Sequence, residues 1–301
     1  MPAPDPNASA AAGPALSVLS VQVDRDRGVG WLWLDRAEAR NAMGRAFFAE
    51  LPQAIGALGA DPAVRAVVVA ARGPHFSVGL DLKELGSTLA GGPTASGEDQ
   101  ATDPTAPRRS SPAARAFATR RSVLAMQAAI TAVADCPKPV LAAVHGACVG
   151  GGVDLVTACD IRLASAEAFF SVRETKVAIV ADLGTLQRLP RIVPAGAVAE
   201  LCFTGKDVPA ERARALGLVN DVLPDPEALW AAAGAMAAEI AANPPLAVQG
   251  TKAVLRASAD RTIAEGLDYV ATWNAGMLQS DDLVEAMTAF VEKRPPRFTG
   301  T

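Results

Sequence analysis

The feature that most constrains the fold of this chain is an alternation of short apolar runs with segments of helical spacing. Apolar runs rich in β-branched residues occupy residues 16–23, 29–34, 63–71 and 139–146. Segments with apolar residues at helical spacing occupy residues 41–58 and 114–136. Strands that alternate with helices in this way predict an α/β fold.

Local signals add detail at the N-terminal end of this pattern. The runs at 16–23 and 29–34 flank a polar turn, which predicts a β-hairpin. Trp31 and Trp33 are two residues apart and should therefore pack on one face of a sheet. Asn41 precedes a helical segment, where we expect it to be the N-cap.

The composition changes along the chain and predicts its organisation. Residues 1–15 are rich in Ala, Pro and small polar residues, and we expect a disordered leader. Residues 16–208 should form the α/β core, interrupted at 86–113 by a mobile loop rich in Gly, Ser, Pro and Thr. Residues 209–301 have an almost wholly helical pattern and should form a helical C-terminal region.

Charge and cysteine usage exclude several classes of protein. The net charge of −4 and the pI of about 5.3 argue against nucleic-acid binding through a broad basic surface. No apolar run is long enough to span a bilayer, and neither end carries a recognisable secretion or peroxisomal signal. The four cysteines lack the CxxC spacing of a metal site. We therefore expect a cytoplasmic protein with reduced thiols, no metal and no contact with membranes.

Three consecutive glycines, Gly150, Gly151 and Gly152, lie between a predicted strand and a predicted helix. Glycine permits close backbone approach, and the N-terminus of the helix would direct free N–H groups and positive charge toward the turn. The turn therefore suits an oxyanion or a phosphate, although a tight turn that merely needs small residues explains the glycines equally well. The GxGxxG and GK[ST] nucleotide motifs are absent.

Three acids flank this turn in the sequence, and each also has a simple structural explanation. Asp154 lies in the first turn of the predicted helix, where an acid complements the helix dipole. Glu174 follows a strand and could be an exposed carboxylate near Arg173 and Lys176. Asp182 lies in the apolar run VAIVADLG and could cap a helix that begins near Thr185. Together, three acids around one glycine-rich turn indicate a site.

Several long motifs, in this order, resemble the crotonase (enoyl-CoA hydratase/isomerase) superfamily. They are HFSVGLDLKEL, VHGACVGGGVDLVTACDIRLAS and FSVRETKVAIVADLGTLQRLPR. The resemblance extends over roughly residues 17 to 298. It implies a spiral of ββα turns with a C-terminal helical region that forms a homo-trimer, or a hexamer built as a dimer of trimers.

The same resemblance implies the substrate and one part of the site. The substrate would be an acyl-CoA thioester, so coenzyme A would enter as part of the substrate, and no metal or redox cofactor is implied. By position, the backbone N–H groups of Leu80 and Gly151 would form the oxyanion hole at the thioester carbonyl. Small flanking residues suit such backbone donors.

The acids distinguish branches of the family. Enoyl-CoA hydratases resemble GGGxE with a second Glu, whereas this chain has Asp154, keeps Glu174 and adds Asp182 where hydratases usually have glycine. That set resembles the Δ3,5-Δ2,4-dienoyl-CoA isomerases of fatty-acid degradation. The resemblance implies that Glu174 serves C2, that Asp182 serves C6, with the reverse assignment left open, and that Asp154 supports Glu174.

Four further residues are candidates for substrate binding. The resemblance implies that Arg40, Lys252 and Lys293 approach the CoA phosphates, Lys293 from its own or a neighbouring subunit. Isolated surface basic residues without any ligand explain them equally well. Trp273 would line the acyl tunnel or simply pack between helices.

Three alternatives remain open from the sequence. The first is an ordinary 2-enoyl-CoA hydratase in which Asp154 acts with Glu174. The second is another crotonase-family reaction on an unusual acyl-CoA, because a fold does not fix its chemistry. The third is a non-catalytic binder of acyl-CoA or RNA, which the acidic composition and the three acids disfavour.

Overall fold

The computed structural model describes residues 16–84 and 111–301, which are built around a central six-stranded sheet. Its strands, in spatial order, are β1 (Leu19–Asp24), β2 (Val29–Leu34), β3 (Ala66–Ala71), β4 (Val140–Val144), β6 (Ile161–Ser165) and β9 (Asp221–Leu223). Strand β1 pairs antiparallel with β2, and all other pairs are parallel. The predicted α/β class is confirmed.

A smaller sheet lies beside the central one and leads into the glycine-rich turn. Its strands, in spatial order, are β5 (Ala147–Val149), β7 (Phe169–Ser171) and β8 (Val208–Pro209). Strand β5 runs parallel to β7, and Ala147 pairs with Phe169. This pairing brings the end of β5, just before Gly150, next to the end of β7, just before Glu174.

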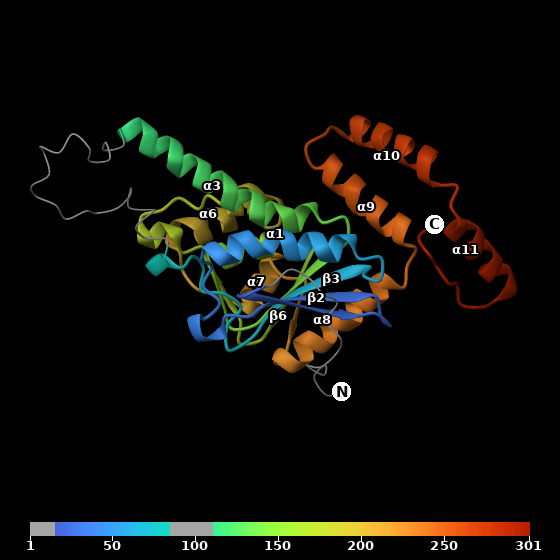
Figure 1. The fold of residues 1–301 in the computed structure, drawn as a ribbon, viewed down its shortest axis with the longest axis horizontal. Coiled ribbons are helices and arrows are strands. Elements are labelled where there is room, and N and C mark those ends of the chain that lie inside the picture. Colours follow the sequence, from blue (N-terminus) through green and yellow to red (C-terminus); the bar gives the residue numbers. More distant parts are fainter. Residues whose placement is uncertain (1–15, 85–110) are drawn as a thin grey trace, which may run out of the picture.

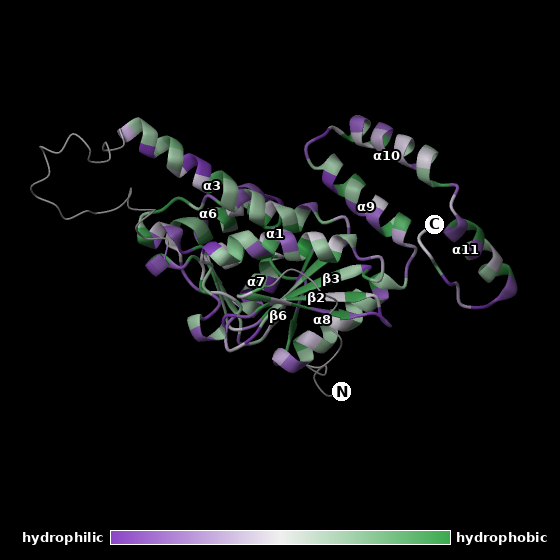
Figure 2. Ribbon diagram, viewed as in Figure 1, coloured by the Kyte–Doolittle hydropathy of each residue, from purple (hydrophilic) through white to green (hydrophobic). Residues whose placement is uncertain are grey.

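Helices cover both faces of the central sheet (Figure 1). Helices α1 (Arg45–Ala60) and α3 (Pro112–Asp135) pack on one face, and α8 (Pro226–Ala241) packs on the other. Because side chains alternate along a strand, Val67 and Val69 join the core with α1 and α3, whereas Val68 joins the core with α8. Apolar residues accordingly gather along the strands in the middle of the molecule (Figure 2).

Short elements connect these layers. They are η1 (Ala37–Ala39), α4 (Gly151–Thr157), η2 (Glu174–Val177), α5 (Thr185–Arg188), η3 (Leu189–Arg191), α6 (Ala195–Thr204) and α7 (Ala210–Leu216). Three longer helices follow α8. They are α9 (Pro245–Ser258), α10 (Ile263–Met277) and α11 (Asp281–Glu292), which extend away from the central sheet (Figure 1).

The predicted hairpin is confirmed, and so is the packing of its two tryptophans. Leu19 pairs with Leu34 and Asp24 with Val29 across β1 and β2. The rings of Trp31 and Trp33 stack with centroids 5.2 Å apart, and Trp33 meets Trp230 of α8 edge to face at 5.6 Å. Aromatic pairs of this kind stabilise beyond their buried area.

The predicted N-cap role of Asn41 is wrong. Helix α1 begins at Arg45 with Gly44 as its N-cap. Asn41 instead lies in a left-handed turn with a φ of 54°. Its buried amide donates to the carbonyls of Arg72 and His75. The side chain therefore joins two loops, because the turn directs it inward rather than toward the helix.

Two predicted segments concern residues that the structure does not describe. The predicted leader at 1–15 lies wholly outside the described residues, and the predicted mobile loop at 86–113 lies outside them at residues 86–110. The last residues of that loop belong to a helix instead, because α3 begins at Pro112. Ser111 is its N-cap and accepts a hydrogen bond from the Ala114 N–H.

The C-terminal third is helical apart from one strand. Strand β9 pairs with β6, and α8 packs on the central sheet, so the chain after Pro209 begins on the α/β core. The boundary at residues 208 and 209 stays a prediction. No helix within residues 16–84 and 111–301 is long and apolar enough to cross a membrane.

Helix α9 is fastened to the core by a buried cation. Lys252 is 6% exposed, and its Nζ lies 2.6 Å from Oδ2 of Asp160 and 2.9 Å from the carbonyl of Lys138. Oδ2 of Asp160 also accepts from the Val140 N–H at 2.7 Å. The Lys252 ammonium thus joins α9 to the loops that begin β4 and β6.

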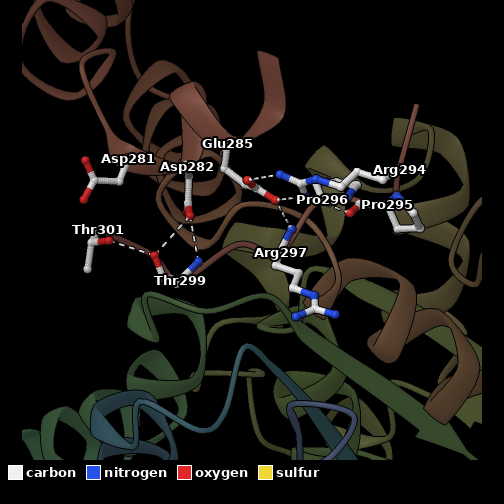
Figure 3. Close-up of a pocket in the computed structure, with 9 residues that line it drawn as sticks. All are labelled: Asp281, Asp282, Glu285, Arg294, Pro295, Pro296, Arg297, Thr299 and Thr301. Atoms are coloured by element: carbon white, nitrogen blue, oxygen red, sulfur yellow. Dashed lines mark hydrogen bonds and ion pairs between the residues drawn. The ribbon is translucent and has the colours of Figure 1, made fainter. Parts of the chain in front are cut away.

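The C-terminal tail folds back over the start of α11 (Figure 3). The backbone N–H groups of Thr299 and Gly300 donate to the buried carboxylate of Asp282. Arg294 forms two hydrogen bonds to Glu285, at 2.6 and 2.8 Å. Nearby, Arg65 at the start of β3 donates to the carbonyl of Phe298, so the tail also contacts the core. The pocket in Figure 3 is lined by residues of α11 and the tail, namely Asp281, Asp282, Glu285, Arg294, Pro295, Pro296, Arg297, Thr299 and Thr301.

Lys252→Met should destabilise the protein by about 2 kcal/mol, because it leaves the Asp160 carboxylate and the Lys138 carbonyl without their buried donor. Urea unfolding at pH 7 measures this loss. The matched control is Lys206→Met, which removes an ion pair with Glu200 whose two side chains are more than one-third exposed. Its effect should stay below about 1 kcal/mol. Equal losses in the two variants would contradict a structural role for Lys252.

Candidate active site

The glycine-rich turn joins β5 to α4, and its glycines leave room for other groups. Gly150 has a φ of 53°, a conformation that favours glycine. A Cβ atom at Gly150 would lie 3.3 Å from an oxygen of Glu174, and one at Gly151 would lie 3.0 Å from the sulfur of Met43. Side chains at these positions would therefore fill the space in front of α4.

Two backbone N–H groups meet at this turn. Met43 donates to the carbonyl of Gly79, and its own carbonyl accepts from the Asp81 N–H, so the Leu80 N–H between them points away from Met43. A Cβ on Gly151 would lie 3.8 Å from the Leu80 nitrogen. Within residues 16–84 and 111–301, neither the Leu80 nor the Gly151 N–H has a hydrogen-bond acceptor. The structure thus brings the two predicted donors together.

The segment before Leu80 is held in place by Ser77, which the sequence analysis did not single out. Its hydroxyl donates to the Asn41 carbonyl at 2.8 Å and accepts from the Gly79 N–H at 3.1 Å. The Ser77 backbone also exchanges hydrogen bonds with Ala147 and Val149. No local pattern marks this serine, since its partners come from distant parts of the chain.

Asp154 lies in the first turn of α4 and is only 1% exposed. Its Oδ1 accepts a hydrogen bond from the Thr185 N–H at 2.6 Å. Thr185 is the first residue of α5, and the N-cap residue of that helix is Gly184, without a side-chain cap. The structural alternative for Asp182, a cap on this helix, therefore fails at this position, because Asp154 from another helix accepts the hydrogen bond from the Thr185 N–H.

Glu174 is the first residue of η2, directly after β7 and Val172–Arg173. Its Oε2 is buried and has no hydrogen-bond partner among the described residues. The alternative of an exposed carboxylate paired with Arg173 or Lys176 fails, since Arg173 pairs with Asp207 and the Lys176 side chain lies along Gly205. Burying a carboxylate oxygen without a hydrogen-bond partner costs free energy of folding, which indicates that Glu174 has a functional role.

Asp182 is half-buried in the loop between η2 and α5. Gln127 of α3 donates a hydrogen bond to its backbone carbonyl at 2.6 Å. Burial raises the pKa of the Asp182 carboxyl above its usual range.

The three carboxyl groups interact electrostatically with one another. The pKa of Glu174 is raised to about 7, mainly by burial and in smaller part by the nearby charges of Asp154 and Asp182. Burial likewise raises the pKa of Asp154 to about 6, with hydrogen bonds from Thr185 opposing the rise and Asp182 adding to it. The structure thus gathers the three predicted acids into one cluster that can hold and release protons near neutral pH.

The four predicted substrate-binding residues lie elsewhere in the described chain. Arg40 is exposed, and its carbonyl accepts from the Val78 N–H on the segment that leads to Leu80. Lys293 is exposed at the C-terminal end of α11. Lys252 is buried and paired with Asp160, so it is neither the isolated surface residue of the alternative nor free to contact a phosphate.

Trp273 lies on α10 and faces α9. A Cβ on Gly250 of α9 would lie 2.5 Å from the indole nitrogen of Trp273, so the ring occupies the space that this glycine leaves. The placement matches the helix-packing alternative, and no contact joins Trp273 to the three acids in the part of the chain that the structure describes. No group of three or more His, Cys, Asp or Glu side chains in residues 16–84 and 111–301 is arranged to hold a metal ion.

Comparisons with known proteins show the family of this chain. The enoyl-CoA hydratase/isomerase family matches residues 24–103 and 111–301. The peroxisomal Δ(3,5)-Δ(2,4)-dienoyl-CoA isomerase of Arabidopsis thaliana is 45% identical over 278 residues, which are 92% of this chain and 95% of that protein. The mitochondrial Δ(3,5)-Δ(2,4)-dienoyl-CoA isomerase of Rattus norvegicus is 42% identical over 87% of this chain and 76% of that protein.

A solved structure supports the same fold. The enoyl-CoA hydratase from Bacillus anthracis superposes with a TM-score of 0.80 and 28% identity. The match covers 95% of this chain and all of that one. The arrangement of sheets and C-terminal helices is therefore shared with that enzyme.

The raised pKa of Glu174 predicts a pH-dependent stability difference. An acid whose pKa is higher in the folded state binds more protons there, so rising pH destabilises the fold between the two values. Glu174→Gln should match wild-type stability near pH 4. Above pH 8 its free energy of unfolding should exceed that of wild type by about 2 kcal/mol. The difference should develop between pH 4.5 and about pH 7, the two pKa values of Glu174.

Urea unfolding across this pH range measures the difference. Glu285→Gln is the control, and its stability difference from wild type should have the opposite sign, because hydrogen bonds from Arg294 hold the pKa of Glu285 down at about 2. That variant should be less stable than wild type at neutral pH and should approach it in acid. If the stability of Glu174→Gln differs from that of wild type by the same amount at every pH, then Glu174 is not buried as described.

Proposed function

The chain belongs to the enoyl-CoA hydratase/isomerase family, and on that premise we propose that it is a Δ3,5-Δ2,4-dienoyl-CoA isomerase of fatty-acid degradation. The observation that carries the proposal is the cluster of Asp154, Glu174 and Asp182 beside two unoccupied backbone N–H groups. A hydratase needs two acids to hold one water, whereas a shift of two double bonds needs proton transfer at two separate carbons. The third acid meets that need.

The N–H groups of Leu80 and Gly151 would bind the thioester oxygen. Removal of a proton from C2 of a 3,5-dienoyl thioester leaves a negative charge that spreads over the thioester oxygen and along the diene to C6. Two backbone donors aimed at that oxygen would hold the charge, and each can stabilise the transition state by roughly 3 kcal/mol. Their lack of other acceptors in the described chain supports this role.

Two carboxyl groups would move the protons. In our assignment Glu174 takes the proton from C2 and Asp182 delivers one to C6, so the double bonds move from positions 3 and 5 to positions 2 and 4. A pKa of about 7 suits Glu174 to proton transfer at neutral pH. Asp154, hydrogen-bonded to Thr185, would orient the loop and raise the pKa of Glu174 through its charge. Exchange of the C2 proton with deuterated solvent distinguishes this assignment from its reverse, because Glu174→Gln should abolish the exchange and Asp182→Asn should leave it.

An enoyl-CoA hydratase is the second candidate, favoured by the fold shared with the Bacillus anthracis hydratase. In that case Asp154 and Glu174 would hold a water molecule. The hydrogen bond from Thr185 occupies one oxygen of Asp154, which argues for a structural use of that acid. We therefore prefer the isomerase.

The proposal requires no metal or redox cofactor, because the isomerisation leaves the oxidation state of the acyl chain unchanged. Coenzyme A would enter as part of the substrate. The cytoplasmic location stays a prediction, since the two relatives described above are named for the peroxisome and the mitochondrion.

We also propose that the protein assembles as a homo-trimer or a hexamer through its C-terminal helices. Large apolar side chains are exposed on α11, including Phe290 at 82% and Val291 at 78%. Patches of this kind mark interaction surfaces. Met287 and Val284 extend the same exposed surface by about one and two turns of the helix, respectively.

Asp182→Asn should lower the turnover of 3,5-dienoyl-CoA by at least about 100-fold, because the amide cannot supply the proton at C6. The measurement follows the appearance of the conjugated 2,4-dienoyl absorbance, with thermal unfolding as a check on the fold. The matched control is Asp207→Asn, an acid in a surface ion pair with Arg173. Rapid hydration of crotonyl-CoA by wild type, without turnover of the dienoyl thioester, would establish the hydratase instead.

Phe290→Asp should shift the protein toward monomer, since burying a charge at an apolar interface is unfavourable. Light scattering coupled to size-exclusion chromatography measures the mass of each species. Lys206→Asp, which alters a polar residue on the core, is the control. A wild-type protein that is monomeric at micromolar concentration would refute the assembly proposal.

A further inference from the structure

Two side chains on one face of α3 contact the segment that carries Asp182. Gln127 and Thr131 are four residues apart and therefore neighbours on the helix surface. Nε2 of Gln127 donates to the Asp182 carbonyl at 2.6 Å. Oγ1 of Thr131 accepts from Nη2 of Arg188 at 3.0 Å. Helix α3 thus reaches the end of the loop directly at Asp182 and, through Arg188, at Leu183.

The guanidinium of Arg188 lies directly against this loop. Its Nη1 donates to the Leu183 carbonyl at 3.3 Å. Gly184 has a φ of 127°, and a Cβ on Gly184 would overlap that same nitrogen. Glycine is therefore required here both for the backbone conformation and for the close approach of the guanidinium.

The other side of the loop is held by α4. The Thr185 N–H donates to Asp154, so residues 182–185 are fixed between α3 and the acid in the first turn of α4. These contacts hold the backbone carbonyls of Asp182 and Leu183 and the N–H group of Thr185. The distance of the Asp182 carboxyl from Glu174 is consequently set by α3 as well as by the loop itself.

We propose that Gln127, Thr131 and Arg188 are positioning residues for the reaction, which hold Asp182 at the distance from Glu174 that transfer between C2 and C6 requires. This inference rests on the proposed isomerase function and adds the group that sets its geometry. We name these three residues the α3 clamp. Displacements of about 1 Å in an active site can lower rates about 100-fold, so a loosened clamp should act on turnover.

Arg188 also contributes its charge. The titratable groups that face Asp154 are Glu174, Asp182, Cys148 and Arg188, and the cation among them opposes the rise in the pKa of Asp154. Removal of the cation should therefore raise that pKa further. Position and charge can be separated experimentally, because lysine keeps the charge but lacks the planar fork that bonds Leu183 and Thr131 together.

The test compares Arg188→Met, Arg188→Lys and Thr131→Val with wild type on a 3,5-dienoyl-CoA. Arg188→Met should lower kcat about 10- to 100-fold with KM changed less than about threefold. Arg188→Lys should also lower kcat without a matching change in KM, because lysine keeps the charge but cannot bond Leu183 and Thr131 together. Thr131→Val, close to isosteric, should lower kcat by a smaller factor in the same direction.

Arg191→Met is the matched control, since Arg191 lies three residues further on and pairs with Asp260 at the surface. It should leave kcat unchanged. Wild-type kcat in both Arg188→Met and Thr131→Val would overturn the proposal. So would a loss in Arg188→Met that tracks its melting temperature and is matched by Arg191→Met.

A substrate-free measurement separates failure of the clamp from failure of the proposed function. If wild type does not turn over the 3,5-dienoyl-CoA, the proposed isomerase function is refuted. The α3 clamp can still be tested by carboxyl-detected NMR titration of protein labelled with 13C-aspartate. Arg188→Met and Thr131→Val should then both shift the Asp182 carboxyl resonance relative to wild type and to Arg191→Met, because both variants remove a contact of the clamp. An Asp182 resonance that is unchanged in both variants would overturn the inference.

Discussion

The hydrogen bond from the Thr185 N–H to Asp154 is the interaction on which the rest of the site depends. It joins α4, which begins at the glycine-rich turn, to α5, which follows Asp182. The backbone donor of Gly151 and the distal acid therefore belong to one connected unit. Burying the Asp154 carboxylate costs free energy, and the hydrogen bond from the Thr185 N–H at the start of α5 offsets part of that cost.

Three like-charged groups in one cluster oppose folding, and the surrounding architecture supplies the stability that tolerates them. Apolar layers pack on both faces of the central sheet, with Trp33 on one side and Val67 on the other. Glu174 keeps an oxygen without any partner in the described chain, and its pKa is raised toward neutrality in consequence. The same burial that destabilises the carboxylate prepares it to exchange a proton at neutral pH.

Helices α9 to α11 are linked to this core at a few polar points and otherwise extend from it (Figure 1). Lys252 binds Asp160 near the start of β6, and Arg65 binds the tail at Phe298. Polar contacts of this kind fix an orientation without burying much apolar surface. The exposed apolar residues of α11 are then left for contacts with other surfaces, as the assembly proposal requires.

The sequence by itself determined the α/β class, the hairpin, the glycine-rich turn and the identity of the three acids, because these follow from local periodicity and from motifs of contiguous residues. Only the tertiary structure decided that Asp154 rather than Asp182 meets the Thr185 N–H, that Asn41 joins two loops, and that Lys252 is buried. Those partners lie 31, 31 to 34, and 92 residues apart along the chain. A hydrogen bond of that span depends on how whole elements pack, and the residues next to each partner carry no trace of it.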